Sequence, residues 1–570
     1  MVALSGLLVT VRSAKQGAEM MVNKLGAEYW REVSTLRMHS EDMHQLAVST
    51  GQTVRIASSH GEAVVSCQEA DVPRGVFFLP LGPVANQLFS GAHTDGTGVP
   101  DWKRLPVTIE RCETLAPALP EVSAAVAGAA RAATGESATT GTGETVVHSN
   151  VVCTFCGCLC DDLEVEVRDN RICKVKKACL IGRNKIMHAQ SNAPVPSVAG
   201  RAVTITESVS EAARILREAR FPLVYGLSSA TTEAQRLLIE IAEIVGGTID
   251  NPSSYCHGPG VMARQQVGLA TCTLGEVKNR ADLIIFWGCN PLEAHMRHLS
   301  RYSSQPRGLF TPEGRKGRRI VAIDIRPTPT TKAADQFIQV EPGTTFETAT
   351  LLRALVRGVR LGIGDDALVA GVPLPIWREL AAAIRSCKYG VIFFGLGVTQ
   401  CRGRDLNPEQ IGVLVREVND YTRFYAIPMR GHGNVAGANQ VMCWQTGFPL
   451  AVNFSRRYPR YNPGEFSILG HLARREVDAA LIVATDPGAH LPQDSVQYLR
   501  EIPTIYLEPH NNTTTGWATV VIPVAPAGIA AAGTMYRMDN IPLRAKKLVH
   551  SPYPSDEEAL RAIKERLLHA

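Results

Sequence analysis

Apolar residues in the larger, C-terminal part of the chain occur in short unbroken runs. The clearest runs are residues 281–288, 319–324, 389–395 and 480–486, and a loop of small or polar residues follows each of them. Unbroken apolar strands that alternate with helices are typical of parallel sheets covered on both faces. The pattern predicts an α/β protein with two Rossmann-like parallel-sheet domains, whose ligands bind at the carboxyl ends of the strands.

The N-terminal part follows a different pattern. Short β-prone runs at 7–11, 53–56, 63–65 and 76–79 are separated by Gly and Pro, and a helix is expected over 17–24. These features predict a compact β-barrel with a helical insert over residues 1–113. Residues 114–148 are rich in Ala, Gly, Ser and Thr, which bury little apolar area, so they are predicted to form a flexible linker.

Composition narrows the class of protein. The chain has 570 residues, of which 45% are hydrophobic and 20% charged, and its formal net charge is +5. The mild charge favours an anionic substrate or cofactor, and the absence of a basic run argues against nucleic acid. No apolar stretch approaches the roughly 20 residues of a membrane span. With 14 cysteines and no secretory signal after Met1, we expect a cytoplasmic protein whose thiols bind metals.

Four cysteines have the spacing C-x2-C-x3-C-x18-C: Cys153, Cys156, Cys160 and Cys179. A cubane [4Fe–4S] cluster needs four thiolates, one per iron. Zinc is the alternative, but a zinc site normally uses two C-x2-C pairs or a Cys/His mixture, and the second pair is absent here. We therefore predict an iron–sulfur domain over residues 149–200, followed by the parallel-sheet domains over 201–570. Cys158 and Cys173 lie in the same stretch, so either could replace one ligand.

The loops after the predicted strands contain groups that suit a nucleotide. Glycine lets the backbone approach a pyrophosphate, and an acidic residue can bind ribose or a purine edge. Each loop alone is explained by turn formation, but several together favour a nucleotide-like ligand. No Walker motif is present, so ATP hydrolysis is disfavoured. The predicted cofactor-binding residues in these loops are Gly288, Asn290, Pro291, Asp324, Arg326, Gly395, Gly397, Thr399, Asp486 and Pro487.

Cys256 and His257 lie in a loop bounded by Gly and Pro, ahead of a helix expected at 261–268. A thiolate at a helix N-terminus is stabilised by the dipole. The alternative is a buried cysteine beside an ordinary turn; with the cysteine motif nearby, a soft metal ligand is the better interpretation. Two His/Arg clusters, 294–298 and 429–434, could bind a carboxylate and exchange protons, or could be solvated patches.

Together these motifs resemble formylmethanofuran dehydrogenase. Residues 149–570 resemble its B-type subunit, a molybdenum or tungsten enzyme of the molybdopterin oxidoreductase superfamily, and residues 1–113 resemble its D-type subunit, a molybdopterin-dinucleotide-binding double-psi β-barrel. These two subunits are usually separate chains, so the linker would join two polypeptides in one. The motifs that carry the resemblance are 153–162, 256–259, 272–282, 287–291, 430–434 and 536–539 in the large part, and 15–18, 78–86 and 97–100 in the small part.

The resemblance implies two molybdopterin guanine dinucleotides that hold molybdenum or tungsten, with Cys256 as a metal ligand. His257 and Arg430 would handle the proton and the formate or CO2, while the cysteine cluster relays electrons. It also implies cofactor contacts from Asn86, Thr97, Gly431 and Asn434. Related formate dehydrogenases carry a lysine just after the fourth cluster cysteine; this chain has Ile181 there, so Lys185 is the residue expected to assist.

The resemblance also implies a multi-subunit complex of one-carbon metabolism, as in methanogenesis. The expected partners are an amidohydrolase-type subunit that exchanges formate, a β-helix-type subunit like the C-type subunit of the family's complexes, and ferredoxin-like electron-transfer subunits. The rival hypothesis is a metal-free scaffold subunit of a bacterial formyltransferase/hydrolase complex. A scaffold need not keep the four cysteines, the Cys256-His257 pair and the dinucleotide-binding barrel, and this chain keeps all three.

Overall fold

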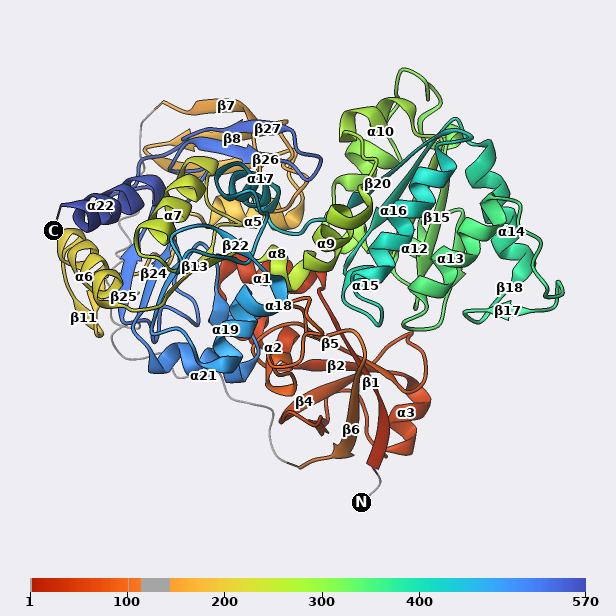
Figure 1. The fold of residues 1–570 in the computed structure, drawn as a ribbon, viewed down its shortest axis with the longest axis horizontal. Helices are drawn as coiled ribbons and strands as arrows, with labels where there is room; N and C mark the ends of the chain where they lie inside the picture. The colour runs from red at the N-terminus through yellow and green to blue at the C-terminus, as the bar shows by residue number, and fades with distance from the viewer. Residues whose placement is uncertain (1–2, 101, 114–143, 570) are drawn as a thin grey trace.

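The computed structural model describes residues 3–100, 102–113 and 144–569. A barrel lies below two α/β units, one around a nine-stranded sheet and one around a five-stranded sheet (Figure 1). Most of the predicted linker, 114–143, lies outside the described residues. Its last residues already belong to the strand β7 (Val146–Val151), so the folded large part begins slightly earlier than predicted.

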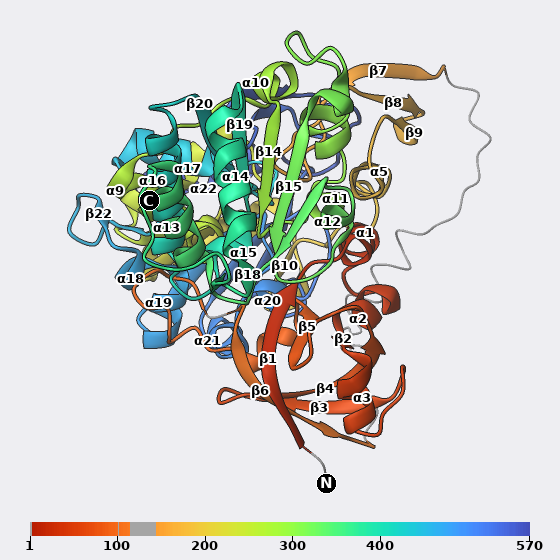
Figure 2. The same cartoon turned by 90° about the vertical axis from the view of Figure 1, so that its right-hand side faces the viewer.

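Six strands close the N-terminal barrel in the order β1-β5-β2-β4-β3-β6. The barrel confirms the predicted small β unit; β2 and β6 were not predicted. Its strands are β1 (Ala3–Val11), β2 (Thr35–Met38), β3 (Thr53–Ala57), β4 (Glu62–Glu69), β5 (Val76–Pro80) and β6 (Leu105–Arg111). The helical insert consists of α1 (Ala14–Val22), α2 (Ala27–Val33) and α3 (Ser40–Gln45). Figure 2 shows β1 running upwards from the barrel so that α1 reaches the large part.

A small three-stranded sheet carries the cysteine motif. It has the order β7-β8-β9, with β8 (Leu163–Arg168) and β9 (Arg171–Lys176), and α5 (Leu180–Met187) follows it. The first three cysteines of the motif lie in the loop between β7 and β8, and Cys179 caps α5 by accepting a hydrogen bond from the Gly182 amide. Helix α5 packs on α1, where Asn184 Nδ2 donates to the Ala18 carbonyl at 3.3 Å.

The nine-stranded sheet has the order β11-β10-β25-β24-β23-β12-β13-β21-β22. Its central strands are parallel: β25 (Val520–Pro523), β24 (Thr504–Glu508), β23 (Ala479–Val483), β12 (Pro222–Gly226) and β13 (Thr248–Asp250). One face packs on α6 (Ile205–Glu218), α7 (Thr232–Ile244) and α22 (Asp556–Leu568). The apolar core of the opposite face is continuous with the core of the barrel, so the barrel is docked on this sheet.

The five-stranded sheet has the order β16-β15-β14-β19-β20, and every pair of neighbouring strands in it is parallel. Its strands are β14 (Leu283–Trp287), β15 (Arg319–Asp324), β16 (Gln336–Gln339), β19 (Tyr389–Phe394) and β20 (Arg423–Pro428). Helices α13 (Thr345–Val356), α14 (Leu374–Ser386) and α16 (Leu406–Val418) cover one face. The two sheets confirm the predicted parallel-sheet architecture.

Both parallel sheets reverse their winding direction within the sheet. In the five-stranded sheet the reversal lies between β14 and β19, and in the nine-stranded sheet between β12 and β23. Loops diverge above such a reversal, so a crevice opens at the carboxyl ends of the strands. Among the described residues, no helix is long and apolar enough to cross a membrane.

Candidate functional site

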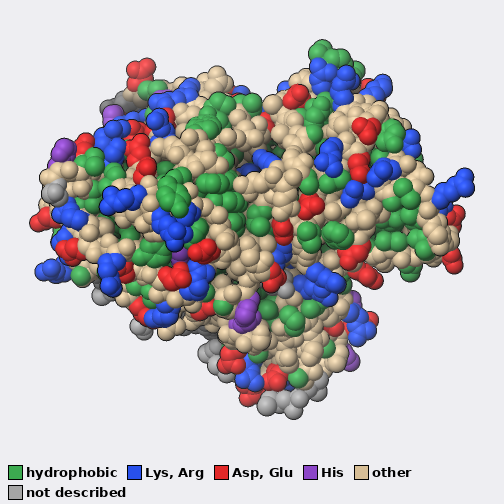
Figure 3. Space-filling model, viewed as in Figure 1, with side chains coloured by type: hydrophobic (Ala, Val, Ile, Leu, Met, Phe, Trp, Pro, Cys, Tyr) green, Lys and Arg blue, Asp and Glu red, His purple; other side chains and the backbone are tan. Residues whose placement is uncertain are grey.

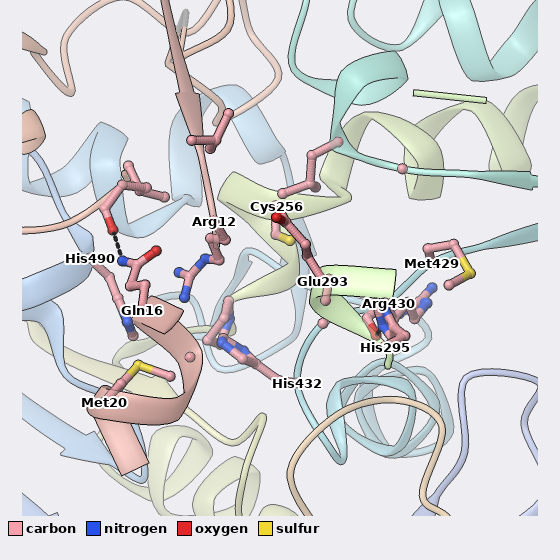
Figure 4. A pocket seen from close by; sticks show the side chains of 18 of the residues that line it. Arg12, Gln16, Met20, Cys256, Glu293, His295, Met429, Arg430, His432 and His490 are labelled. Carbon is pink, nitrogen blue, oxygen red and sulfur yellow. Dashed lines mark hydrogen bonds between the residues drawn. The ribbon is translucent and has the colours of Figure 1, made fainter. Parts of the chain in front are cut away.

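A cavity of about 430 Å³ lies where the barrel and the two sheets meet. The end of β1, helix α1, helix α5 and the loops after β14, β15, β19, β20, β23 and β24 all contribute to its walls. Figure 4 shows Arg12 and Gln16 entering from the barrel side, opposite Cys256, Glu293 and Arg430. A cavity built from three units at the carboxyl ends of two parallel sheets is the arrangement that holds an extended nucleotide-like ligand.

Part of the cavity wall consists of glycine residues whose backbones pack closely against each other. The Gly397 amide donates to the Gly288 carbonyl at 3.0 Å, which joins the loops after β14 and β19. A Cβ atom on Gly288 would lie 3.0 Å from the Gly397 Cα, and φ at Gly288 is +57°, so glycine is required there. The predicted residues that line the cavity are Gly288, Asn290, Pro291, Asp324, Arg326, Gly395, Gly397, Gly431 and Asp486.

Five other predicted cofactor-binding residues lie outside the cavity lining: Asn86, Thr97, Thr399, Asn434 and Pro487. Asn86 Nδ2 donates to the Ala489 carbonyl at 3.0 Å and thereby joins the barrel to the large part. Thr399 Oγ1 donates to the Cys256 carbonyl at 3.3 Å, and Thr97 Oγ1 donates within its own turn to the Thr94 carbonyl at 2.7 Å. In the structure Asn86 and Thr399 brace the site, and the contact of all five residues with a cofactor stays a prediction.

Cys256 ends the short helix α8 (Ser253–Cys256) and points into the cavity (Figure 4). The segment is fixed by Asp250, which accepts hydrogen bonds from Ser254 Oγ at 2.7 Å and from the Ile468 amide at 2.8 Å. Burial raises the pKa of the Cys256 thiol to about 11, and the charges of Arg12, Arg430 and Lys103 oppose this rise. Cys256 lies at the end of α8 and not at a helix N-terminus, as was predicted, and burial favours the protonated thiol, so a metal ion would have to displace the proton.

His257 is buried, and its Nε2 lies 3.1 Å from the Met429 carbonyl. A carbonyl only accepts, so the ring proton lies on Nε2, and Nδ1, which has no partner among the described residues, keeps its lone pair. Burial and the charge of Arg430 lower the pKa of His257 to about 3, so the ring is neutral near pH 7. Arg430 is buried beside it, and burial lowers its pKa to about 9.

The four cysteines of the motif face one small cavity, which Cys158 also lines. Exposed Cys173 on β9 lies away from it, so Cys173 is the poorer substitute ligand. Burial raises the pKa of Cys153 to about 12, whereas hydrogen bonding with the Cys158 thiol lowers that of Cys156 to about 6.

The motif places four thiols around one small cavity, and this donor set fits the four thiolates, one per iron, that a [4Fe–4S] cluster needs. Across the described residues, no group of three or more His, Cys, Asp or Glu side chains is placed to hold a metal ion. A Cβ atom on Gly182 would lie 2.8 Å from Cys153 Sγ, so the glycine leaves room for this sulfur atom.

Several charged residues of the cavity were not among the predicted site residues. Arg12 and Lys103 come from the barrel and act on Cys256. Lys24 Nζ lies 3.3 Å from Asp486 Oδ2, an ion pair between α1 and the loop after β23. Arg12 directly follows the β-prone run 7–11, and this place at the end of a predicted strand was the signal for it in the sequence.

Comparisons with known proteins agree with this geometry. The family described as the Molydopterin dinucleotide binding domain matches residues 7–106, the range of the barrel. The B-type subunit of the tungsten-containing formylmethanofuran dehydrogenase 2 of Methanocaldococcus jannaschii is 45% identical over 414 residues, which cover 71% of this chain and 94% of the relative. The chain belongs to the family of formylmethanofuran dehydrogenase B-type subunits.

Two further relatives extend the comparison. Protein FwdD of Methanocaldococcus jannaschii is 34% identical over 101 residues, which cover 17% of this chain and 75% of that protein. A chain of the formyltransferase/hydrolase complex FhcABCD from Methylorubrum extorquens, solved in complex with methylofuran, is 25% identical. It aligns with a TM-score of 0.53 over 66% of this chain and 99% of that chain. The chain is therefore similar to components of both a dehydrogenase and a hydrolase complex.

Proposed function

We propose that this chain is the catalytic subunit of a formylmethanofuran dehydrogenase-type complex and interconverts CO2 and formate at a molybdenum or tungsten centre held by two pterin guanine dinucleotides. The observation that carries the proposal is the position of Cys256 in a cavity shared by the barrel and both parallel sheets. When bound, such a centre supplies the two-electron redox chemistry, with the Cys256 thiolate as a ligand from the protein.

The chain's own residues have separate tasks in this proposal. Arg430 holds the carboxylate of formate through a charge-assisted pair. His257 is neutral, and its Nδ1 keeps a free lone pair. Because the charge of Arg430 is one cause of its lowered pKa, a carboxylate bound to Arg430 would make Nδ1 a better acceptor for the proton that formate gives up on oxidation. The Met429 carbonyl fixes the orientation of the ring through Nε2. The loops at Gly288 and Gly397 leave room for the pyrophosphates.

The proposed electron relay is a [4Fe–4S] cluster at Cys153, Cys156, Cys160 and Cys179. Lys185 supports it, because it lines the large cavity while its Nζ donates to the Thr154 carbonyl at 3.1 Å, next to Cys153. A cation between the two sites favours the arrival of an electron at either one. Lys185 is one helical turn beyond Ile181 on α5, so it takes the same face of the helix.

We further propose that the barrel is a D-type domain joined to the B-type part in one chain. The family match over residues 7–106 and the likeness to FwdD support this. The formyl amide step requires a partner of the amidohydrolase type, with β-helix-type and ferredoxin-like subunits completing the complex. A cytoplasmic location stays a prediction.

The alternative is a metal-free scaffold in a formyltransferase/hydrolase complex, which the likeness to a chain of FhcABCD favours. The two are separated by elemental analysis of anaerobically purified protein and by formate oxidation with an artificial electron acceptor. We expect about four irons and molybdenum or tungsten in the wild type, and loss of activity in Cys256→Ala with iron retained. If the wild type holds no molybdenum or tungsten, and the activity of the complex survives Cys256→Ala, the chain is a scaffold.

A further inference from the structure

The His/Arg cluster 294–298 lies between the cysteine motif and the large cavity and contacts both. It begins at the last residue of the short helix α11 (Pro291–Ala294). His295 is buried, and its Nε2 lies 2.7 Å from the carbonyl of Arg430, beside which Figure 4 shows it. Two residues further on, Arg297 lines the small cavity of the four motif cysteines. The cluster is therefore packed between the two sites and is not a solvated patch.

Arg297 is the only Lys, Arg, Asp or Glu residue among the described residues that line the small cavity. Its guanidinium group is bound to Asp162, which lies two residues after Cys160. Nη1 donates to one carboxylate oxygen and Nη2 to the other, both at 2.7 Å. Arginine has five N–H donors, so three remain without a protein acceptor in the described part of the chain. Nearby charges and hydrogen bonds to sulfur are the features that set the reduction potential of an iron–sulfur cluster.

A second arginine balances the charge around this pair. Arg301, on the π-helical turn Leu299–Ser303, pairs with Asp161 and with Asp162. Two arginines thus face two aspartates. The side chains of Arg297 and Asp162 are 20% and 31% exposed, so water and salt screen them less than they screen surface charges. Loss of one member of the pair therefore leaves an uncompensated charge beside the cysteine loop.

We propose that Arg297 is a positioning residue for the iron–sulfur cluster: its pair with Asp162 holds the loop that carries Cys160, and its charge raises the reduction potential of the cluster. This inference rests on the proposed cluster at the four cysteines. One-electron reduction adds one negative charge to a cluster, so a cation at the cavity wall stabilises the reduced form and a carboxylate disfavours it. Because His295 bonds to Arg430, the same segment ties the cluster loop to the loop that would hold formate.

Two variants that change the charge in opposite directions test the proposal. In the anaerobically purified complex, the cluster is reduced stepwise with dithionite and mediator dyes while its low-temperature EPR signal is followed. Arg297→Gln should lower the midpoint potential and Asp162→Asn should raise it, each by about tenfold in the equilibrium constant of reduction, which is about 59 mV for one electron. A pair that only supports the fold would shift both variants in the same direction. Shifts of the same sign, or no shift, would overturn the proposal.

Further variants separate the charge from the fold. Arg297→Lys keeps the charge and should restore at least half of the shift. The double variant Arg297→Gln, Asp162→Asn removes both charges and should return the potential towards the wild-type value. If Arg297→Gln loses its iron, Asp162→Asn decides: a raised potential supports the proposal and an unchanged one refutes it. If all the single variants lose their iron, the pair only holds the loop and the proposed effect on the potential is wrong.

Arg353 and Glu417 provide the matched control. Arg353 Nε and Nη2 donate to the two carboxylate oxygens of Glu417 at 3.0 and 2.8 Å, and the two side chains are 24% and 15% exposed. This pair joins α13 to α16, and neither residue lines the small cavity. Basic and acidic side chains are scattered over the face of the molecule in Figure 3, where water screens them, so an exposed arginine would be a weaker control. Arg353→Gln should leave the potential unchanged, and a shift as large as that of Arg297→Gln would show that the effect is not local.

Iron content and activity separate this proposal from the proposed function. If the wild type shows the cluster signal but does not oxidise formate, the proposed catalytic function fails, and the titration still decides the role of Arg297. If the wild type is active and the variants keep its potential, only the role of Arg297 is wrong. A wild type without iron would refute the electron relay and this proposal together.

Discussion

Asn434 is a brace for the loop that carries Arg430, and its replacement should loosen that loop before any ligand binds. The side chain is fully buried. Its Nδ2 donates to the Ala230 carbonyl at 2.8 Å, and its Oδ1 accepts from the Tyr536 amide at 2.7 Å. Three segments distant in the sequence therefore meet at one amide group.

Asn434→Ala leaves the buried C=O of Ala230 without this partner and frees the N–H of half-buried Tyr536. One unsatisfied buried group costs about 1–3 kcal/mol, so the local opening free energy should fall by about that amount. Hydrogen exchange at the Tyr536 amide should then be at least about fivefold faster in cofactor-free protein. Peptides covering 430–437 and 533–539 in a mass-spectrometric exchange experiment give the measurement.

Asn419→Ala is the matched control. Asn419 makes a similar set of bonds, to the Val415 carbonyl and to both backbone groups of Phe424, but it is exposed, so water can replace it. Its replacement should have a much smaller effect on local exchange. If Asn434→Ala leaves exchange at Tyr536 unchanged and only reduces the bound pterin, then Asn434 contacts the cofactor and the brace interpretation is wrong.

Three further predictions concern other parts of the site. Cys160→Ser should remove most of the iron and the low-temperature EPR signal of a reduced cluster, whereas Cys173→Ser should leave both in place; equal iron loss in the two variants would contradict the ligand set. Lys24→Met leaves the buried Asp486 carboxylate without its cation and should weaken docking of the barrel. The protein should then retain less pterin on gel filtration; unchanged retention would show that this ion pair does not hold the barrel in place. Burial raises the pKa of Asp556 from 3.8 to about 7, so its contribution to stability is full below pH 3.8 and is lost as pH rises through 7. Asp556→Asn should therefore raise the urea midpoint at pH 8 and change it little near pH 4, and a variant less stable at pH 8 would refute this.

The parallel sheets were predictable because their strands are buried on both faces and therefore read as unbroken apolar runs. The same pattern predicted that the loops after β14, β15 and β19 line a ligand site. The bracing role of Asn434 was not predictable, because its partners Ala230 and Tyr536 are far away in the sequence. The approach of Arg12 and Lys103 to Cys256 was not predictable either, because it depends on the docking of the barrel on the nine-stranded sheet; the sequence marked only the place of Arg12 at a strand end. The strand β2 was missed because its four residues, Thr35–Met38, are too few to show a clear alternation of apolar and polar positions.

The barrel and the units that it covers are parts of one polypeptide, and this affects how the cavity is filled. Bonds such as Asn86 to Ala489 and Asn184 to Ala18 hold the barrel and α1 against the large part. In a complex of separate chains, a lid that opens can diffuse away, and its return depends on its concentration. Here the barrel stays attached to the units that it covers, so its effective concentration at the site does not depend on the protein concentration. Loading is then an opening and closing within one molecule, and dilution of the protein does not uncover the site.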